Sequence, residues 1–200
     1  MARREHERIL QDTEREQGHT ALRNNVRAAL ALADAVRSTI GPLGLDKMLI
    51  SDEGDVQVTN DGVTVLEAAK VEHPTARMLI STSSVQDDEA RDGTSSAIVL
   101  TAELLLNALD WIDRGIHPSV MVAGYRIAMD HSLIAIEDIS RPMEEADNIR
   151  IVSTSLAGKV GEDVRRILSN LAVETASIAA DRGSSKHVDP DLIKRIIIRG

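Results

Sequence analysis

The sequence predicts a mainly α-helical protein with one β-hairpin and a small amount of further β structure. Apolar residues recur at steps of three and four over several long segments, which is the pattern of one apolar helix face. Trp111 and Tyr125 are the only aromatic residues, so aliphatic side chains have to form the core, as they do in packed helices. The 200 residues suffice for one sizeable domain, or for one domain and part of another.

The chain begins with a polar, charged stretch, residues 1–18, which has no apolar stripe and which we interpret as a flexible arm. A helix is predicted from near Thr20, because apolar residues follow at helical spacing: Leu22, Val26, Ala29, Ala33, Val36 and Ile40. Gly41-Pro42 is expected to end this helix, since proline cannot continue a helix and disfavours helical geometry in the residue before it.

A hairpin is predicted over 48–59. Two short β-prone runs, 47–50 and 56–59, flank a segment rich in turn residues. Asn60-Asp61-Gly62 is a further turn signal, and we expect a short helix after it, over 63–70.

Three longer helices are predicted next, over 75–89, over 94–113 and from Pro118, a residue that is tolerated in a first turn. The second helix has a clear apolar stripe, made of Ile98, Ala102, Leu105, Leu109 and Ile112. Arg141-Pro142 closes this helical block, and a change of composition places a domain boundary near it.

The last third of the sequence is expected to mix strand and helix. β-Prone residues predict a strand over 149–156, and a helix is predicted after it, over 162–180. We expect a linker over 181–191 and a final β-prone run over 193–199.

Composition and charge exclude several functions. A net charge of −9 repels phosphate backbones, so we expect no nucleic-acid partner. The absence of cysteine excludes disulfides, thiolate metal sites and cysteine nucleophiles. We find no apolar run of membrane-spanning length and no signal-like N-terminus, which indicates a soluble, cytoplasmic protein without a membrane partner.

One candidate site is a glycine-rich loop that runs from Thr39 to Lys47. Gly41 and Gly44 flank Pro42, and such a backbone can approach an anion closely and point N–H groups at it. The loop lacks the spacing of the Walker A motif. A simple turn at the end of a helix explains the same residues, so both interpretations are open.

A second candidate is Asp92-Gly93-Thr94-Ser95-Ser96, which opens the predicted helix 94–113. A helix N-terminus with small hydroxyl side chains is suited to binding an anion. Asp92 is able to hold Mg²⁺ against bound phosphates, because Mg²⁺ prefers carboxylate oxygens. Alternatively, Asp92 only caps the helix.

Two weaker candidates are single charged residues. Asp61 lies in a turn and either forms an Asx turn or helps to orient a metal or a water molecule. Lys159 lies between two glycines, where a lysine either reaches a phosphate as a point charge or is an ordinary solvated loop residue.

Taken together, these segments resemble the group II chaperonins, the archaeal thermosome and its eukaryotic cytosolic relatives. The resemblance runs over residues 20–200 through an ordered series of motifs: Thr39-Ile40-Gly41-Pro42-Leu43-Gly44-Leu45-Asp46-Lys47-Met48-Leu49, Val58-Thr59-Asn60-Asp61-Gly62-Val63-Thr64, Val71-Glu72-His73-Pro74, Gln86-Asp87-Asp88-Glu89, Asp92-Gly93-Thr94-Ser95-Ser96, Gly115-Ile116-His117-Pro118 and Gly124-Tyr125-Arg126. Each motif is modest, but the whole series in this order is specific.

The resemblance implies a domain plan and a site. Residues 19–143 are similar to the N-terminal half of the helical equatorial, ATP-binding domain, and residues 144–200 to the first segment of the α/β intermediate domain. Asp92 is implied to bind Mg²⁺, Asp61 to assist catalysis, and Lys159 to sense the γ-phosphate. Contacts to ATP are implied for Ile40, Gly41, Pro42, Gly93, Thr94, Ser95 and Ser96.

The resemblance also implies a function. A full-length subunit is an ATPase that couples hydrolysis to protein folding, pairs with other chaperonin subunits in a double ring, and binds unfolded client proteins through an apical domain. That domain and the main water-activating aspartate are expected beyond Gly200, because family members are more than twice as long and this chain starts with Met1. The alternative is a non-enzymatic assembly protein, or a truncated chaperonin-like protein, without ATP turnover.

Four positions depart from the family pattern. Leu43 stands where many members have lysine, which removes a charge but leaves the backbone of the loop. Arg91 stands where glycine is usual, and it is strained if that position needs a positive φ. Ser95 and Ser96 replace threonines and keep the hydroxyl groups.

Overall fold

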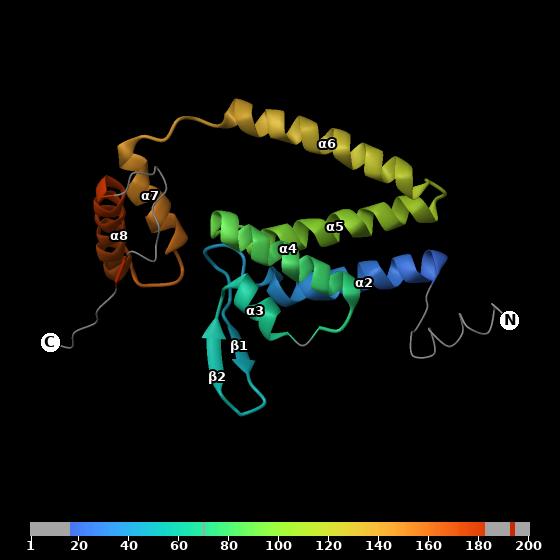
Figure 1. The fold of residues 1–200 in the computed structure, drawn as a ribbon, viewed down its shortest axis with the longest axis horizontal. Helices are drawn as coiled ribbons and strands as arrows, with labels where there is room; N and C mark the ends of the chain where they lie inside the picture. The colour runs from blue at the N-terminus through green and yellow to red at the C-terminus, as the bar shows by residue number, and fades with distance from the viewer. Residues whose placement is uncertain (1–16, 70, 183–192, 195–200) are drawn as a thin grey trace. The chain divides into compact units, whose positions relative to one another are not determined.

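The structure, a computed structural model, describes residues 17–69, 71–182 and 193–194. Within these ranges the chain divides into two compact units, with the division between Asp130 and His131. The fold is mainly α-helical with one small two-stranded sheet, as the sequence predicts (Figure 1).

The first unit is built from helices and one hairpin. Its elements in chain order are α2 (Gly18–Arg37), β1 (Lys47–Ile50), β2 (Val56–Thr59), α3 (Gly62–Ala68), α4 (Pro74–Ala90), α5 (Thr94–Asp113) and the start of α6 (Pro118–Ile139). These bounds agree with the predicted ones to within a few residues. One difference is the end of α2: the helix stops at Arg37, so Ile40 and Gly41-Pro42 lie in a turn after it.

The core of this unit lies between α2, α3, α4 and α5 and is aliphatic, as composition requires. Burying each of the larger side chains contributes about 1.5–3 kcal/mol. The buried residues of this core are Ala29, Leu32, Ala33, Val36, Val65, Leu66, Ala76, Leu79, Ile98 and Ala102.

Helix α5 is long and apolar enough to cross a membrane by length and composition alone, contrary to the sequence expectation. It lies beside α2 and α4 and contributes Ile98 and Ala102 to the core (Figure 1). Only 28% of its apolar stretch is buried within the structure, and Leu100, Leu104 and Trp111 are exposed.

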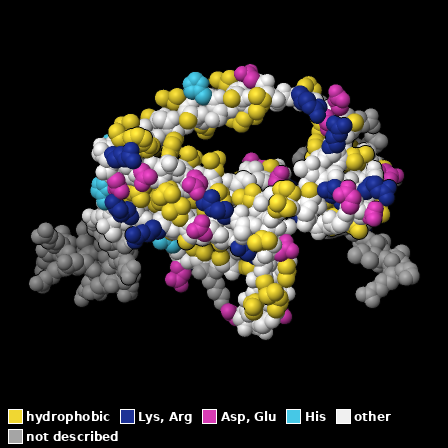
Figure 2. All heavy atoms as spheres, turned by 180° about the vertical axis from the view of Figure 1, so that it is seen from behind, with side chains coloured by type: hydrophobic (Ala, Val, Ile, Leu, Met, Phe, Trp, Pro, Cys, Tyr) yellow, Lys and Arg dark blue, Asp and Glu magenta, His cyan; other side chains and the backbone are white. Residues whose placement is uncertain are grey.

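The hairpin projects from the helices and has one solvent-exposed apolar face. Met48 pairs with Val58 and Ile50 with Val56 in an antiparallel register. Residues two apart on a strand share a face, so these four side chains lie on the same side of the ribbon. They are 59–68% exposed, and Figure 2 shows hydrophobic atoms over the projecting hairpin.

The second unit contains the end of α6, α7 (Glu145–Ser155) and α8 (Glu162–Arg182). The predicted strand over 149–156 is wrong, because those residues form most of α7. Of the predicted run 193–199, only 193 and 194 are described, and they have no regular structure; the rest lies outside the described residues, as do the arm before 17 and most of the expected linker.

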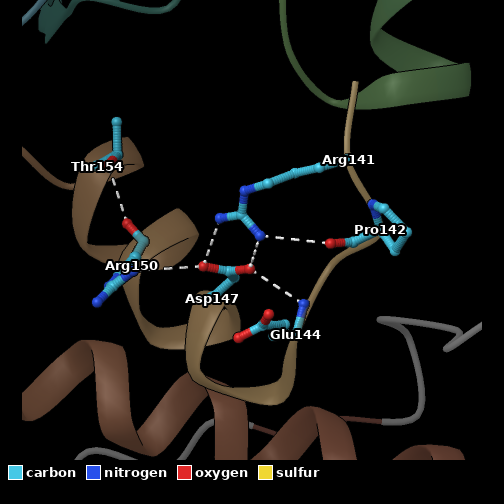
Figure 3. A network of polar contacts seen from close by, with 6 residues as sticks. All are labelled: Arg141, Pro142, Glu144, Asp147, Arg150 and Thr154. Atoms are coloured by element: carbon cyan, nitrogen blue, oxygen red, sulfur yellow. Dashed lines mark hydrogen bonds and ion pairs between the residues drawn. The ribbon is translucent and has the colours of Figure 1, made fainter. Parts of the chain in front are cut away.

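Local contacts explain why this β-prone segment is helical. Asp147, the third residue of α7, accepts the backbone N–H of Glu144 at 3.0 Å and so caps the helix start (Figure 3). The hydroxyl of Thr154 donates to the carbonyl of Arg150 at 2.8 Å, one turn back. Helix α7 as a whole also packs against α8, although its Ile149 and Ile151 side chains are exposed. Caps and tertiary packing override the strand propensity of the segment.

Candidate functional site

The antiparallel packing of α2 on α5 decides which ends of these helices meet. Arg23, near the start of α2, donates to Asp113 at the end of α5, with 2.8 Å between Nη2 and Oδ2. Arg37, at the end of α2, pairs with Glu103 of α5, and this hydrogen bond raises the pKa of the Arg37 guanidinium. The loop after α2 therefore reaches the beginning of α5.

That loop is tight, and glycine is required at two positions. Gly41 has a φ of +85°, a left-handed value that favours glycine. A Cβ on Gly44 would lie 2.2 Å from the carbonyl oxygen of Thr39. The Thr39 hydroxyl is buried and donates to the carbonyl of Val36 at 2.7 Å. Ile40, Gly41 and Pro42 themselves are exposed, so their backbone is accessible to a ligand.

The second element of the site is the N-terminus of α5. Gly93, not Asp92, is the N-cap residue, so capping by the Asp92 side chain is wrong; that carboxylate instead accepts the backbone N–H of Gly93 at 2.8 Å. The first backbone bond of the helix runs from the N–H of Ala97 to the carbonyl of Gly93 at 2.9 Å. The N–H groups that precede this bond belong to Thr94, Ser95 and Ser96, and they point out of the helix end.

Arg91 holds the turn before this helix in a conformation that is unusual for arginine. Its φ is +53° and its ψ +21°, and it is the only residue other than glycine with a positive φ in the described part of the chain. Its backbone N–H donates to the carbonyl of Asp87 at 2.9 Å, and its guanidinium lies 3.1 Å from the Asp87 carboxylate. Left-handed backbone at a residue with a Cβ costs about 1–2 kcal/mol.

The third element is the start of α3. Asp61 is its N-cap: Oδ2 accepts the backbone N–H of Thr64 at 2.8 Å and the Thr64 hydroxyl at 2.6 Å. The Asp61 backbone N–H donates to the Thr59 hydroxyl at 3.1 Å. Asp61 therefore caps α3 through a residue three positions on, which is a helix N-cap and not the expected Asx turn, and its bonds to Thr64 hold the carboxylate in place.

These three elements meet at Ser95. The hydroxyl oxygens of Thr39 and Ser95 are 3.5 Å apart. A Cβ on Gly62 would lie 2.2 Å from the Ser95 hydroxyl oxygen and 3.2 Å from that of Thr94. Two helix N-termini, those of α3 and α5, thus converge beside the glycine loop. At α5 the positive end of the helix dipole and the unpaired backbone N–H groups favour an anion, whereas the N-terminus of α3 is already capped by the Asp61 carboxylate.

Sequence analysis included Thr39 and Gly62 in its candidate segments but gave neither residue a role in the site. Thr39 opens the glycine loop, and Gly62 follows the capping Asp61. Lys159 belongs to the second unit, where it is exposed in the loop between α7 and α8 and its N–H donates to the carbonyl of Leu156 at 3.1 Å.

The donor set fits Mg²⁺ held together with phosphates better than a metal held by protein alone. In the described part of the chain there is no group of three or more His, Asp or Glu side chains that could hold a metal. Asp92 offers an exposed carboxylate next to the N–H groups of α5. Mg²⁺ is typically bound by one or two carboxylates plus substrate phosphates and water.

Comparison with known proteins agrees with the motifs. The sequence profile of the TCP-1/cpn60 chaperonin family matches residues 32–200. A thermosome subunit alpha of Archaeoglobus fulgidus is 42% identical over 190 residues, 93% of this chain and 35% of the relative. A thermosome subunit alpha of Thermoplasma acidophilum is 41% identical over 181 residues, 90% of this chain and 33% of the relative.

A thermosome subunit of Methanocaldococcus jannaschii is 41% identical over 187 residues, 92% of this chain and 34% of that protein. The chain thus spans about a third of the length of the curated relatives it matches. The match covers the glycine loop, the start of α3 and the start of α5, and on these grounds the chain belongs to the TCP-1/cpn60 chaperonin family as the N-terminal portion of a group II subunit.

Proposed function

We propose that the first unit forms the phosphate- and Mg²⁺-binding half of the ATP site of a chaperonin subunit. The observation that carries this proposal is the meeting of the α3 and α5 N-termini and the glycine loop around Ser95. Backbone N–H groups, helix dipoles and small hydroxyls gather there, and together they suit a polyphosphate even on a protein with a net charge of −9.

Each residue has a proposed role. The N–H groups of Thr94, Ser95 and Ser96, with Gly93, bind phosphate oxygens at the α5 N-terminus. The exposed backbone of Ile40, Gly41 and Pro42 approaches the same phosphates from the loop. Asp92 binds Mg²⁺, which when bound neutralises charge on the phosphates.

Two further residues act on the γ-phosphate side. Asp61 assists by orienting water or metal, and its bonds to Thr64 keep the carboxylate in place for that purpose. For Lys159, the resemblance to the family implies that it senses the γ-phosphate as a point charge. The main water-activating aspartate is expected outside these 200 residues.

For the full-length subunit we propose ATP hydrolysis coupled to protein folding in a double ring. Other chaperonin subunits are its partners, unfolded proteins are its clients, and the cytoplasm is its compartment. Three relatives are named as thermosome subunits, which supports the proposal. In this plan residues 19–143 are the first half of the equatorial domain and residues 144–200 the first segment of the intermediate domain.

A non-enzymatic assembly role is the second candidate, and the hairpin favours it. Met48, Ile50, Val56 and Val58 form an exposed apolar face that suits packing against a neighbouring subunit. Assembly and ATP turnover are separable, because a chain with this surface assembles whether or not its site hydrolyses ATP.

Mg-ATP titration and steady-state ATPase measurements test the proposal. Residues 1–200 are expected to bind Mg-ATP weakly and to show no sustained hydrolysis, since loss of a positioned general base costs about 10²–10⁴-fold in rate. In a full-length subunit, Asp92→Ala should abolish turnover, whereas Asp61→Ala should slow hydrolysis more than it weakens binding. Asp88→Ala, which removes an exposed carboxylate from α4, is the control. Normal turnover in Asp92→Ala would refute the site.

A further inference from the structure

The backbone conformation at position 62 does not require a glycine. Gly62 is the first residue of α3, and unlike Gly41 and Gly93 it does not have a positive φ. Alanine would suit a helix better, because glycine loses more conformational entropy on folding. The reason for glycine at this position must therefore lie in its surroundings.

Those surroundings are the hydroxyl groups at the start of α5. A Cβ on Gly62 would lie 2.2 Å from the Ser95 hydroxyl oxygen, 3.3 Å from the Ser95 Cβ and 3.2 Å from the Thr94 hydroxyl oxygen. The first distance is far below any real contact, and the other two are tight. Gly62 is buried, so α3 has no open space into which it can move without disturbing the core.

The Ser95 hydroxyl also lies near a second hydroxyl group, that of Thr39. Thr39 has one hydroxyl hydrogen and donates it to the carbonyl of Val36 at 2.7 Å. In its 3.5 Å contact with Ser95, Thr39 therefore accepts and Ser95 donates. Any added atom at Gly62 would push the Ser95 oxygen out of this position, and it would then leave Thr39.

We infer that Gly62 is a positioning residue for the phosphate site, and that it acts through the Ser95 hydroxyl. Its missing side chain lets α3 come close enough to hold that hydroxyl against Thr39, with the first N–H groups of α5 in fixed positions around it. The inference rests on the proposed function, because it concerns the geometry of the anion that those N–H groups bind.

The test is a double-mutant cycle on the full 200-residue chain with Gly62→Ala, Ser95→Ala and the double variant. Mg-ATP is titrated and followed by NMR through the backbone amide shifts of Thr94, Ser95 and Ser96, with a melting curve for each variant. Gly124→Ala is the matched control, because Gly124 is also helical, lacks a positive φ and has nothing within 4 Å of an added Cβ.

Gly62→Ala is expected to weaken Mg-ATP binding about fivefold to tenfold in the chain that keeps Ser95, and less than about twofold in the Ser95→Ala background. Gly124→Ala should leave affinity unchanged. Wild-type affinity in Gly62→Ala, or the same loss in both backgrounds, would overturn the inference and leave the proposed function standing. No Mg-dependent shift in the wild-type chain would overturn the proposed function itself.

If Gly62→Ala fails to fold, a second variant tests whether the contact with Ser95 is the cause. Ser95→Gly removes the Ser95 hydroxyl oxygen at 2.2 Å and the Ser95 Cβ at 3.3 Å from the added methyl group. Recovery of the folded state in Gly62→Ala/Ser95→Gly supports the contact, and failure to recover it overturns the contact and the inference.

Discussion

Arg141 and Asp147 form a two-point ion pair in which Nη1 lies 2.7 Å from Oδ2 and Nη2 lies 2.9 Å from Oδ1 (Figure 3). Paired hydrogen bonds of this kind fix the direction of both side chains. Arg141 also donates to the carbonyl of Pro142 at 3.3 Å, and Asp147 caps α7 through the Glu144 N–H. The segment that follows α6 is thereby fastened to the first turn of α7.

This pair makes the stability of the second unit sensitive to acid. The hydrogen bonds from Arg141, and next the one from the Glu144 backbone, lower the pKa of the Asp147 carboxyl below its usual 3.8. Because the folded pKa is the lower one, the stabilisation is fully present above the unfolded value and is lost as the pH falls through the folded pKa. Protonation of Asp147 therefore weakens both the ion pair and the cap.

We predict that Asp147→Asn destabilises α7 above about pH 5, and that its difference from wild type shrinks steadily below about pH 4. Urea unfolding followed by circular dichroism at a series of pH values measures this difference. Arg150→Ala serves as the control, because Arg150 is more distant, at 3.6 Å, and 78% exposed. A difference between Asp147→Asn and wild type that is independent of pH would contradict the assignment.

Replacing Arg91 by glycine should stabilise the first unit. The substitution relieves a left-handed residue, worth about 1–2 kcal/mol, and loses an exposed ion pair worth about 0.3–0.5 kcal/mol. Glycine also has greater conformational freedom in the unfolded chain, which offsets part of this stabilisation. We therefore expect the free energy of unfolding to increase by about 0.5 kcal/mol. Denaturant titration measures it. Arg91→Ala keeps the strain and loses the ion pair, so a gain in stability from that variant would disprove the explanation.

Ser83 is a second position where a substitution should stabilise the protein. Its side chain in α4 is fully buried, and its hydroxyl has no hydrogen-bond partner within the described residues. A buried polar group without a partner carries a desolvation cost, so Ser83→Ala should raise the free energy of unfolding by about 1 kcal/mol. Ser84→Ala is the comparison, because its hydroxyl donates to the carbonyl of Ile80 at 3.2 Å and alanine there should bring no gain. Equal effects of the two variants would speak against the prediction.

The hairpin face should matter for association and not for the fold of a single chain. Ile50→Lys and Val58→Lys place charges at positions where the side chains are 68% and 59% exposed. The free energy of unfolding should therefore stay within about 0.5 kcal/mol of the wild-type value. In a full-length subunit the same variants should reduce ring assembly as seen by light scattering. Residues 1–200 alone should form no closed double ring. Normal rings from Ile50→Lys would contradict the interface, whereas a discrete ring from residues 1–200 would contradict only the expectation that this chain alone does not close a ring.

Much of the fold is determined locally and is therefore visible in the sequence. The apolar stripe of α5 predicts its bounds, 94–113, and turn residues between β-prone runs predict the hairpin. The whole ordered series of motifs, which includes the glycine loop and the Asp92 motif, suffices to place the chain in its family. These features depend on residues close together in the chain, so periodicity and motif spacing record them.

Only the tertiary structure determined the relationships between distant residues. The segment 149–156 is helical because an ion pair, a cap and packing against α8 outweigh the strand propensity of its β-branched residues. Ser95 lies against both Thr39 and Gly62 because the antiparallel packing of α2 on α5 and the burial of α3 bring three helix ends together. Neither contact has a period or a spacing in the chain, since each depends on where the core places whole helices.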